Sequence, residues 1–284
     1  MPSWKNATRS TSGVLRPDEI QERTRLRREH AVSPELAPYV ERYWTVRWDL
    51  EAAAAYRAEV LSDPAVNVSV EQGSHPRFGV VLPAALVHGV VTRRFSVDLS
   101  GTGAVAAVKF RPGGFYALAG VRPARNTVVL LTDQLALDPA TVTAAVLGEP
   151  DDGARTSILD AALRPLAREP ATAYLELLAI LDRMRGERSL VRVDQVAADS
   201  GVSVRALQRL FTTYVGVGAK AVLARYRLQD AVASIDTGEV EQLAELAIEL
   251  GWFDQAHFSR EFRGVVGTTP SAYLNRARGA RAHS

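Results

Sequence analysis

Two short segments near the carboxyl end of the chain carry the side chains best suited to recognition chemistry. These side chains are Arg205, Gln208 and Arg209 in the first segment and Gln255, His257 and Arg260 in the second. Arginine presents a fork of N–H donors to guanine or to a phosphate, and glutamine can pair with adenine through two hydrogen bonds. The chain shows no catalytic constellation. The residue types therefore predict binding to nucleic acid and no enzymatic activity.

Both segments belong to one pattern that occurs twice between Val191 and Arg278, about 50 residues apart. With one residue inserted in the second copy, the matched pairs are Val196-Ala197 and Leu246-Ala247, Gly201 and Gly251, Ser203 and Asp254, Leu207 and Phe258, Arg209 and Arg260, Phe211 and Phe262, Gly216 and Gly267, Arg225 and Arg276, and Arg227 and Arg278. An internal repeat identifies the building unit before any single residue is interpreted. Each copy predicts a helix, a tight turn at glycine and a second, arginine-bearing helix.

The first copy predicts a short helix over residues 193–198 that ends near Gly201, where glycine supplies the positive φ of a tight turn. Ser203 is expected to cap the next helix, predicted over residues 203–214. Three apolar residues at helical spacing face the core: Leu207, Leu210 and Phe211. The outward side chains are Val204, Arg205, Gln208 and Arg209. A plain solvated helix face is the alternative, and the surrounding frame of turn, cap and apolar residues favours a functional one.

The second copy repeats this frame, with Gly251 in the turn and Asp254 as the cap of a helix predicted over residues 254–265. The inward residues are Phe258, Phe262 and Val265. The outward residues are Gln255, Ala256, His257, Ser259, Arg260 and Arg263. His257 has no partner ligand or nucleophile nearby in the sequence, so a groove or packing role is favoured over a metal site.

The segment from Gly251 to Arg263 reads GWFDQAHFSREFR, and Gly267-Thr268-Thr269-Pro270-Ser271-Ala272-Tyr273 follows it. Together they resemble the C-terminal signature of AraC-type transcription regulators, and the likeness covers roughly residues 188–276. That family joins two helix–turn–helix subdomains by a long helix, which corresponds to Ala219–Ile235. The resemblance implies a sequence-specific transcription regulator that places its two recognition helices in successive major grooves of promoter DNA.

The resemblance also implies which side chains contact DNA. They are Ser203, Val204, Arg205, Gln208 and Arg209 in the first unit and Asp254, Gln255, Ala256, His257, Ser259, Arg260 and Arg263 in the second. Two departures bear on this assignment. Ala219 stands where proline is usual, which alters only a helix start. Ala256 cannot hydrogen-bond a base edge and can at most touch a thymine methyl group.

The rest of the chain differs from the repeat in composition and hydrophobic pattern. The sequence as a whole predicts an α+β multidomain protein. Residues 1–29 predict a basic, disordered tail. Residues 30–140 predict a β-rich regulatory domain, residues 141–187 a helical connector that packs or dimerises, and residues 188–284 the bipartite DNA-binding domain. The strand segments are 43–50, 58–61, 66–71, 78–82, 87–99 and 105–110.

A second reading makes the β-rich domain a small-molecule-binding or enzymatic unit, with DNA binding secondary. Six aromatic residues could line its ligand pocket, although such residues more often form a core. They are Tyr43, Trp44, Trp48, Phe110, Phe115 and Tyr116. The segment Val108–Phe115 loosely resembles the sensor domains attached to some AraC-type regulators. Its Arg111–Phe115 part could belong to the mouth of the pocket, or it could be a turn whose aromatic side chain packs onto the sheet.

Two other signals are weak. Gly101-Thr102-Gly103 begins a loose dinucleotide fingerprint, but no acidic residue follows in a second strand, and a hairpin turn explains it better. His75 and His88 stand without a carboxylate in register, so no metal site is expected. No cofactor is expected either.

Composition limits the remaining classes. The chain has 284 residues, no cysteine and a formal net charge of +2, so a DNA-binding surface requires local clustering of positive side chains. The lack of cysteine excludes disulfides and the family branch that carries an alkyl-transfer domain. No membrane span or signal peptide is recognisable, which predicts a cytoplasmic protein. The partners left open are a small-molecule effector, a second copy as homodimer and, for an activator, RNA polymerase.

Overall fold

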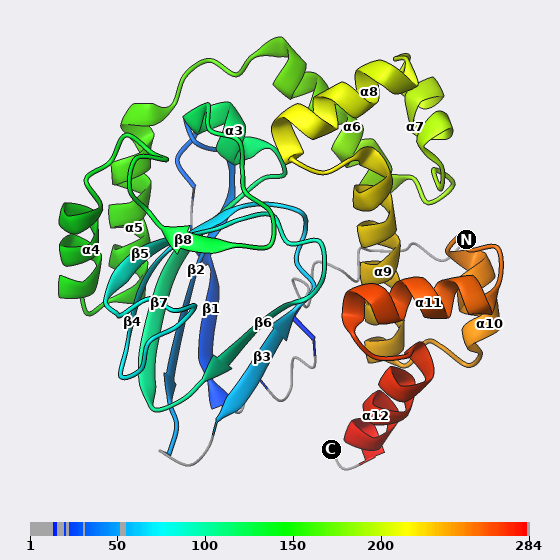
Figure 1. The fold of residues 1–284 in the computed structure, drawn as a ribbon, viewed down its shortest axis with the longest axis horizontal. Coiled ribbons are helices and arrows are strands. Elements are labelled where there is room, and N and C mark those ends of the chain that lie inside the picture. Colours follow the sequence, from blue (N-terminus) through cyan, green and yellow to red (C-terminus); the bar gives the residue numbers. More distant parts are fainter. Residues whose placement is uncertain (1–13, 16–19, 21–22, 31, 52–54, 283–284) are drawn as a thin grey trace.

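The computed structural model describes residues 14–15, 20, 23–30, 32–51 and 55–282. A β-rich domain comes first along the chain, and an all-helical region follows it (Figure 1). This order confirms the predicted α+β arrangement. Within the described ranges, none of the helices is both long and apolar enough to cross a membrane.

The β-rich domain contains two antiparallel sheets. The strands are β1 (Arg25–His30), β2 (Val40–Asp49), β3 (Tyr56–Val60), β4 (Asn67–Gly73), β5 (Ala84–His88), β6 (Phe95–Leu99), β7 (Thr102–Phe110) and β8 (Val128–Leu130). The six-stranded sheet has the order β1-β2-β7-β4-β5-β8, and β3 pairs with β6 in a separate sheet. Strand β7 is buried along most of its length because both faces of the sheet are covered.

The helices follow in chain order. They are α3 (Gly114–Ala119), α4 (Pro139–Gly148), α5 (Asp152–Leu163), α6 (Thr172–Gly186), α7 (Val193–Asp199), α8 (Val204–Leu210), α9 (Ala219–Thr237), α10 (Leu243–Glu249), α11 (Gln255–Val266) and α12 (Pro270–Ala282). A 3₁₀ turn, Arg164–Leu166, follows α5, and a π-helical turn, Phe211–Val215, continues α8. Helices α4 and α5 pack against the main sheet, so this part of the predicted connector covers the β-rich domain (Figure 1).

Three sequence expectations for the β-rich domain are wrong. The segment 78–82 forms no strand, because Phe78 and Gly79 both adopt positive φ in a turn. Gly101 lies in no hairpin: β6 and β7, on either side of it, belong to different sheets. Part of the predicted disordered tail forms β1, whose backbone pairs with β2 at the sheet edge. Edge pairing uses backbone groups and therefore needs no apolar pattern.

The packing of the helical region is uneven. One apolar cluster runs from the main sheet through α5 and α6 into α7, α8 and the first half of α9. A second cluster is formed by the remainder of α9 with α10, α11 and α12, and it includes only Leu15 and Leu61 from the preceding domain. A third cluster lies between the two sheets. The two halves of the repeat therefore rest on different cores.

Candidate nucleic-acid interface

The turn of the first unit, between α7 and α8, is closed by backbone hydrogen bonds. Gly201 adopts a φ of +66°, and the N–H of Val202 donates to the carbonyl oxygen of Ala197 over 3.0 Å. Ser203 caps α8, because its Oγ accepts from the N–H of Ala206 over 3.1 Å. Both the glycine turn and the cap agree with the sequence prediction.

The turn of the second unit, between α10 and α11, repeats this geometry. Gly251 adopts a φ of +82°, and the N–H of Trp252 donates to the carbonyl oxygen of Ala247 over 2.9 Å. Trp252 thus occupies the place that Val202 has in the first unit. The guanidinium of Arg227 lies 4.5 Å from the Trp252 ring centroid and donates to the Gly251 carbonyl over 3.0 Å.

One extra residue, Phe253, separates the second turn from its cap. Its side chain is 87% exposed, which is unusual for a large aromatic group. The cap follows at once: Oδ1 of Asp254 accepts from the N–H of His257 over 2.6 Å. The sequence showed the insertion but gave no sign of the exposure, so Phe253 was missed as a candidate contact.

The outer faces of both recognition helices carry the predicted contacts. Ser259 is half-buried, and the other eleven are exposed: Ser203, Val204, Arg205, Gln208, Arg209, Asp254, Gln255, Ala256, His257, Arg260 and Arg263. The inner faces carry fully buried Leu207, Phe211, Phe258 and Phe262, as predicted. Leu210 and Val265 are only half-buried, and Val266 is buried instead.

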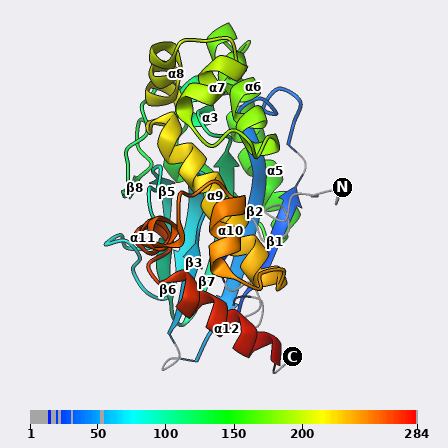
Figure 2. The same ribbon diagram turned by 90° about the vertical axis from the view of Figure 1, so that its right-hand side faces the viewer.

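The long helix α9 holds the two units at its opposite ends. Figure 2 shows helices α8 and α11 on the same side of α9. Two capped helices with polar outer faces are thus presented together. This arrangement can meet one face of an extended, anionic partner.

A cavity lies between the two sheets of the β-rich domain. Its volume is about 170 Å³, and its walls are mostly apolar. Of the six predicted pocket residues only Trp44 and Trp48 line it. Tyr43, Phe110 and Phe115 are buried in the large core cluster. Tyr116 packs edge-on against Tyr214, with their ring centroids 5.2 Å apart. The pocket prediction is wrong for these four. Tyr43 and Phe110 take the opposite face of the sheet by strand alternation, and Phe115 and Tyr116 lie on helix α3.

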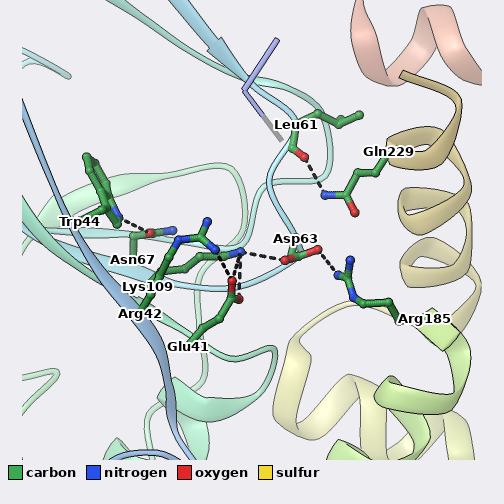
Figure 3. Close-up of polar contacts among 9 residues, drawn as sticks. All are labelled: Glu41, Arg42, Trp44, Leu61, Asp63, Asn67, Lys109, Arg185 and Gln229. Carbon is green, nitrogen blue, oxygen red and sulfur yellow. Dashed lines mark hydrogen bonds and ion pairs between the residues drawn. The ribbon is translucent and has the colours of Figure 1, made fainter. Parts of the chain in front are cut away.

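Two of the residues that line this cavity, Arg42 and Lys109, belong to a network of charges (Figure 3). Nζ of Lys109 lies 2.7 Å from Oδ2 of Asp63 and 2.9 Å from Oε2 of Glu41. Asp63 also pairs with Arg185 of α6, and Arg42 pairs with Glu41. Burial raises the pKa of Asp63, but the charges of Lys109 and Arg185 outweigh it and hold the pKa well below its usual value.

His88 lies in the cavity wall beside Ser69 and Glu71. Its Nε2 is 2.8 Å from Oγ of Ser69 and 3.0 Å from Oε1 of Glu71. A nucleophilic relay needs the serine and the carboxylate on different ring nitrogens. Because both contacts use Nε2, and Glu71 also pairs with buried Arg77, the group is structural. His75 lies elsewhere, and among the described residues no group of three metal-ligating side chains occurs.

In the comparisons with known proteins, two separate parts of the chain match two different families. Residues 196–276 match a family described as a helix-turn-helix domain, and residues 28–129 match a domain of unknown function, DUF6597. The regulatory protein SoxS of Salmonella typhimurium is 35% identical over 86 residues, which cover 30% of this chain and 79% of SoxS. The chain belongs to the AraC-type family of helix–turn–helix transcription regulators.

Two further proteins are similar to parts of this AraC-type regulator. The HTH-type transcriptional regulator GlxA of Rhizobium meliloti is 32% identical over 108 residues, which span 37% of this chain but only 33% of GlxA. A fatty-acid-bound structure of ToxT from Vibrio cholerae covers 82% of this chain and 94% of its own, with 14% identity and a TM-score of 0.41. The relatives are transcription regulators rather than enzymes, in agreement with the expectation from sequence.

Proposed function

We propose that this regulator reads an asymmetric promoter site with one protomer, by placing α8 and α11 in successive major grooves. The observation that carries the proposal is the exposure of the predicted contact residues on two capped helices that lie toward the same side of α9. Arg205, Gln208 and Arg209 would read the first groove, and Gln255, His257 and Arg260 the second. Ser203, Val204, Asp254, Ala256, Ser259 and Arg263 would complete the contact surface.

The test begins with selection of DNA sites from a random duplex pool by the full chain, followed by footprinting. The expected footprint covers two successive major grooves without dyad symmetry. Arg209→Ala and Arg260→Ala should each weaken binding to the selected site by about 1–3 kcal/mol where the arginine reads a base. Arg57→Ala is the matched control, because Arg57 is exposed on β3 and pairs with Asp98. Wild-type affinity in both recognition-helix variants would overturn the assignment, and a dyad-symmetric footprint would indicate a homodimer.

The cavity supports a second proposal, that the β-rich domain binds a small apolar effector. A dry cavity of roughly 150 Å³ holds one benzene-sized ring, so the volume of about 170 Å³ fits a ligand of one ring. The cationic groups of Lys109 and Arg77 in its wall are paired with carboxylates, so the wall offers a ligand mainly dispersion contacts.

A panel of apolar aromatic compounds tests this effector proposal. A compound that binds should raise the temperature of unfolding in proportion to the logarithm of its concentration. Val97→Phe, which fills the cavity from β6, should abolish the shift, whereas Val81→Phe at a 77% exposed position should keep it. A shift that survives in Val97→Phe would place the ligand elsewhere.

A further inference from the structure

An open hollow lies between the start of β6 and the C-terminal half of α11. Its volume is about 680 Å³, and four arginines line it: Arg93 and Arg94 from the β-rich domain and Arg260 and Arg263 from α11. Among the residues that the structure describes, no carboxylate lines the hollow. Arg93, Arg260 and Arg263 are exposed, and no carboxylate in the described part of the chain forms an ion pair with any of them. The hollow is therefore a concentrated positive surface built by both domains.

Arg94 fixes the two sides of the hollow relative to each other. Its N–H donates to the Val265 carbonyl over 2.9 Å, and its Nη1 donates to the Val266 carbonyl over 2.8 Å. Its Nε donates to Oε1 of Glu59 over 2.6 Å. The last carbonyls of a helix have no partner within the helix, so an arginine from another domain satisfies part of the end of α11.

Gly267 is required for this contact. It adopts a φ of +84°, and a Cβ at this position would lie 1.2 Å from Nη1 of Arg94. The matching glycine of the first unit, Gly216, has a similar φ of +82°, but its Cβ would meet only the edge of Pro123 at 3.2 Å. The close approach of an arginine side chain to the helix-ending glycine is thus specific to the second unit.

We infer that this hollow binds the phosphate backbone of DNA beside the major groove that receives α11, with Arg93 as a phosphate contact donated by the β-rich domain. The inference rests on the proposed DNA binding. A duplex that carries α11 in its groove presents phosphates along the borders of that groove, and arginine is the preferred phosphate partner in such positions. Figure 2 shows β6 on the same side of the molecule as α8 and α11. The backbone of a duplex bound to both recognition helices would therefore pass the hollow.

This role differs from that of the recognition helices. Phosphate contacts position a protein on the duplex and carry no sequence information of their own. Arg93 therefore adds affinity for any duplex, while Gln255, His257 and Arg260 of α11 remain the residues that choose the sequence. The β-rich domain then changes affinity directly, by placing or withdrawing one cation.

The experiment compares Arg93→Ala with wild type in the full chain, on the selected site and on an unrelated duplex. Arg93→Ala should weaken binding to both duplexes by a similar factor. It should also lower the slope of log K against log salt by about 0.9, the value for one lost phosphate contact. Arg57→Ala, which removes an exposed arginine from the two-stranded sheet that β6 forms with β3, should leave the slope and the affinity unchanged.

Other outcomes would contradict either the inference about the hollow or the proposed function. An unchanged salt slope in Arg93→Ala would overturn the inference, even if inorganic phosphate still bound the hollow. Loss of affinity confined to the selected site would also overturn it, because Arg93 would then read sequence. Failure of the wild-type chain to prefer any selected site would instead overturn the proposed function. Equal unfolding temperatures of wild type and Arg93→Ala would show that the comparison concerns binding alone.

Discussion

The first helix–turn–helix unit, α7 and α8, and the second, α10 and α11, share a turn geometry but rest on different cores. In the first unit, Leu207 and Phe211 join the cluster that continues to Phe110 in the main sheet. In the second unit, Phe258 and Phe262 belong to a small cluster confined almost entirely to α9–α12. The first unit is thus part of the β-rich domain's core, whereas the second is packed mainly on itself.

The second unit and the linking helix α9 contact the β-rich domain largely through polar groups. Besides the Arg94 contact with α11, two side chains of α9 donate to this domain: Gln229 to the Leu61 carbonyl over 2.8 Å, and Arg225 to the carbonyls of Val91 and Arg93 over 3.2 and 3.3 Å. Burial lowers the pKa of Arg225 to about 10. Regions with less shared apolar burial open at lower free energy. We therefore expect the second unit to detach before the first one unfolds.

The strongest test truncates one core aromatic residue in each unit. Phe211→Ala and Phe262→Ala each remove a fully buried ring, at a cost of about 3–5 kcal/mol. Phe211→Ala should raise hydrogen exchange in α7, α8 and the main sheet together. Phe262→Ala should raise it in α10–α12 only. Faster exchange throughout the main sheet in Phe262→Ala would show that the two cores act as one.

The ion pairs of Asp63 join β7 to α6, on the side of the molecule that carries the first unit. A substitution of Asp63 therefore tests the stability of that side. The folded pKa of Asp63 lies below its unfolded value of about 3.9, so the stabilisation is complete above about pH 4 and is lost as the pH falls further. Asp63→Asn should lower the free energy of unfolding by roughly 3–5 kcal/mol at neutral pH, since it leaves Arg185 without its ion-pair partner and Lys109 with Glu41 alone.

Urea unfolding as a function of pH measures this effect. The difference in free energy of unfolding between wild type and Asp63→Asn should stay constant above about pH 4 and narrow below it. A gap that does not narrow in acid would mean that packing, rather than the charge of Asp63, accounts for the loss.

Arg94→Ala tests how the second unit is attached. The loss of hydrogen bonds from a charged group to the end of α11 and to Glu59 should cost about 1.5–3 kcal/mol. Hydrogen exchange should rise in α10–α12 and stay unchanged in α7 and α8, and Arg57→Ala should behave as wild type. If exchange in α10–α12 did not change, the apolar contacts of Leu15 and Leu61 would suffice to hold this unit.

The smallest expected change in stability concerns Phe253, the extra residue of the second turn. Phe253→Ser should change the free energy of unfolding by less than about 0.5 kcal/mol, because the ring is exposed. An effect on DNA affinity without an effect on the unfolding temperature would make Phe253 a contact. Val202→Ser, at the half-buried turn position of the first unit, should show the reverse pattern.

Local features were predictable from sequence, and features that depend on distant pairing were not. The caps at Ser203 and Asp254, the glycine turns and the buried faces follow from positions a few residues apart. The hairpin at Gly101 was wrong because the pairing of β6 depends on β3, some 40 residues earlier. The cavity was missed in part because strand register decides which face each aromatic residue takes. The contact of Arg94 with α11 joins residues more than 170 positions apart, and no local pattern indicates it.

The length of α9 has a consequence for the DNA itself. Its 19 residues make a rod of about 28 Å, while one turn of B-DNA advances about 34 Å. For the proposed placement of both recognition helices in successive grooves, the duplex would have to shorten that interval by bending between the two grooves. The free-energy cost of bending depends on the base steps that bend, and flexible pyrimidine–purine steps bend most easily. Under that proposal, the fixed rod would make the untouched spacer base pairs part of the recognised sequence.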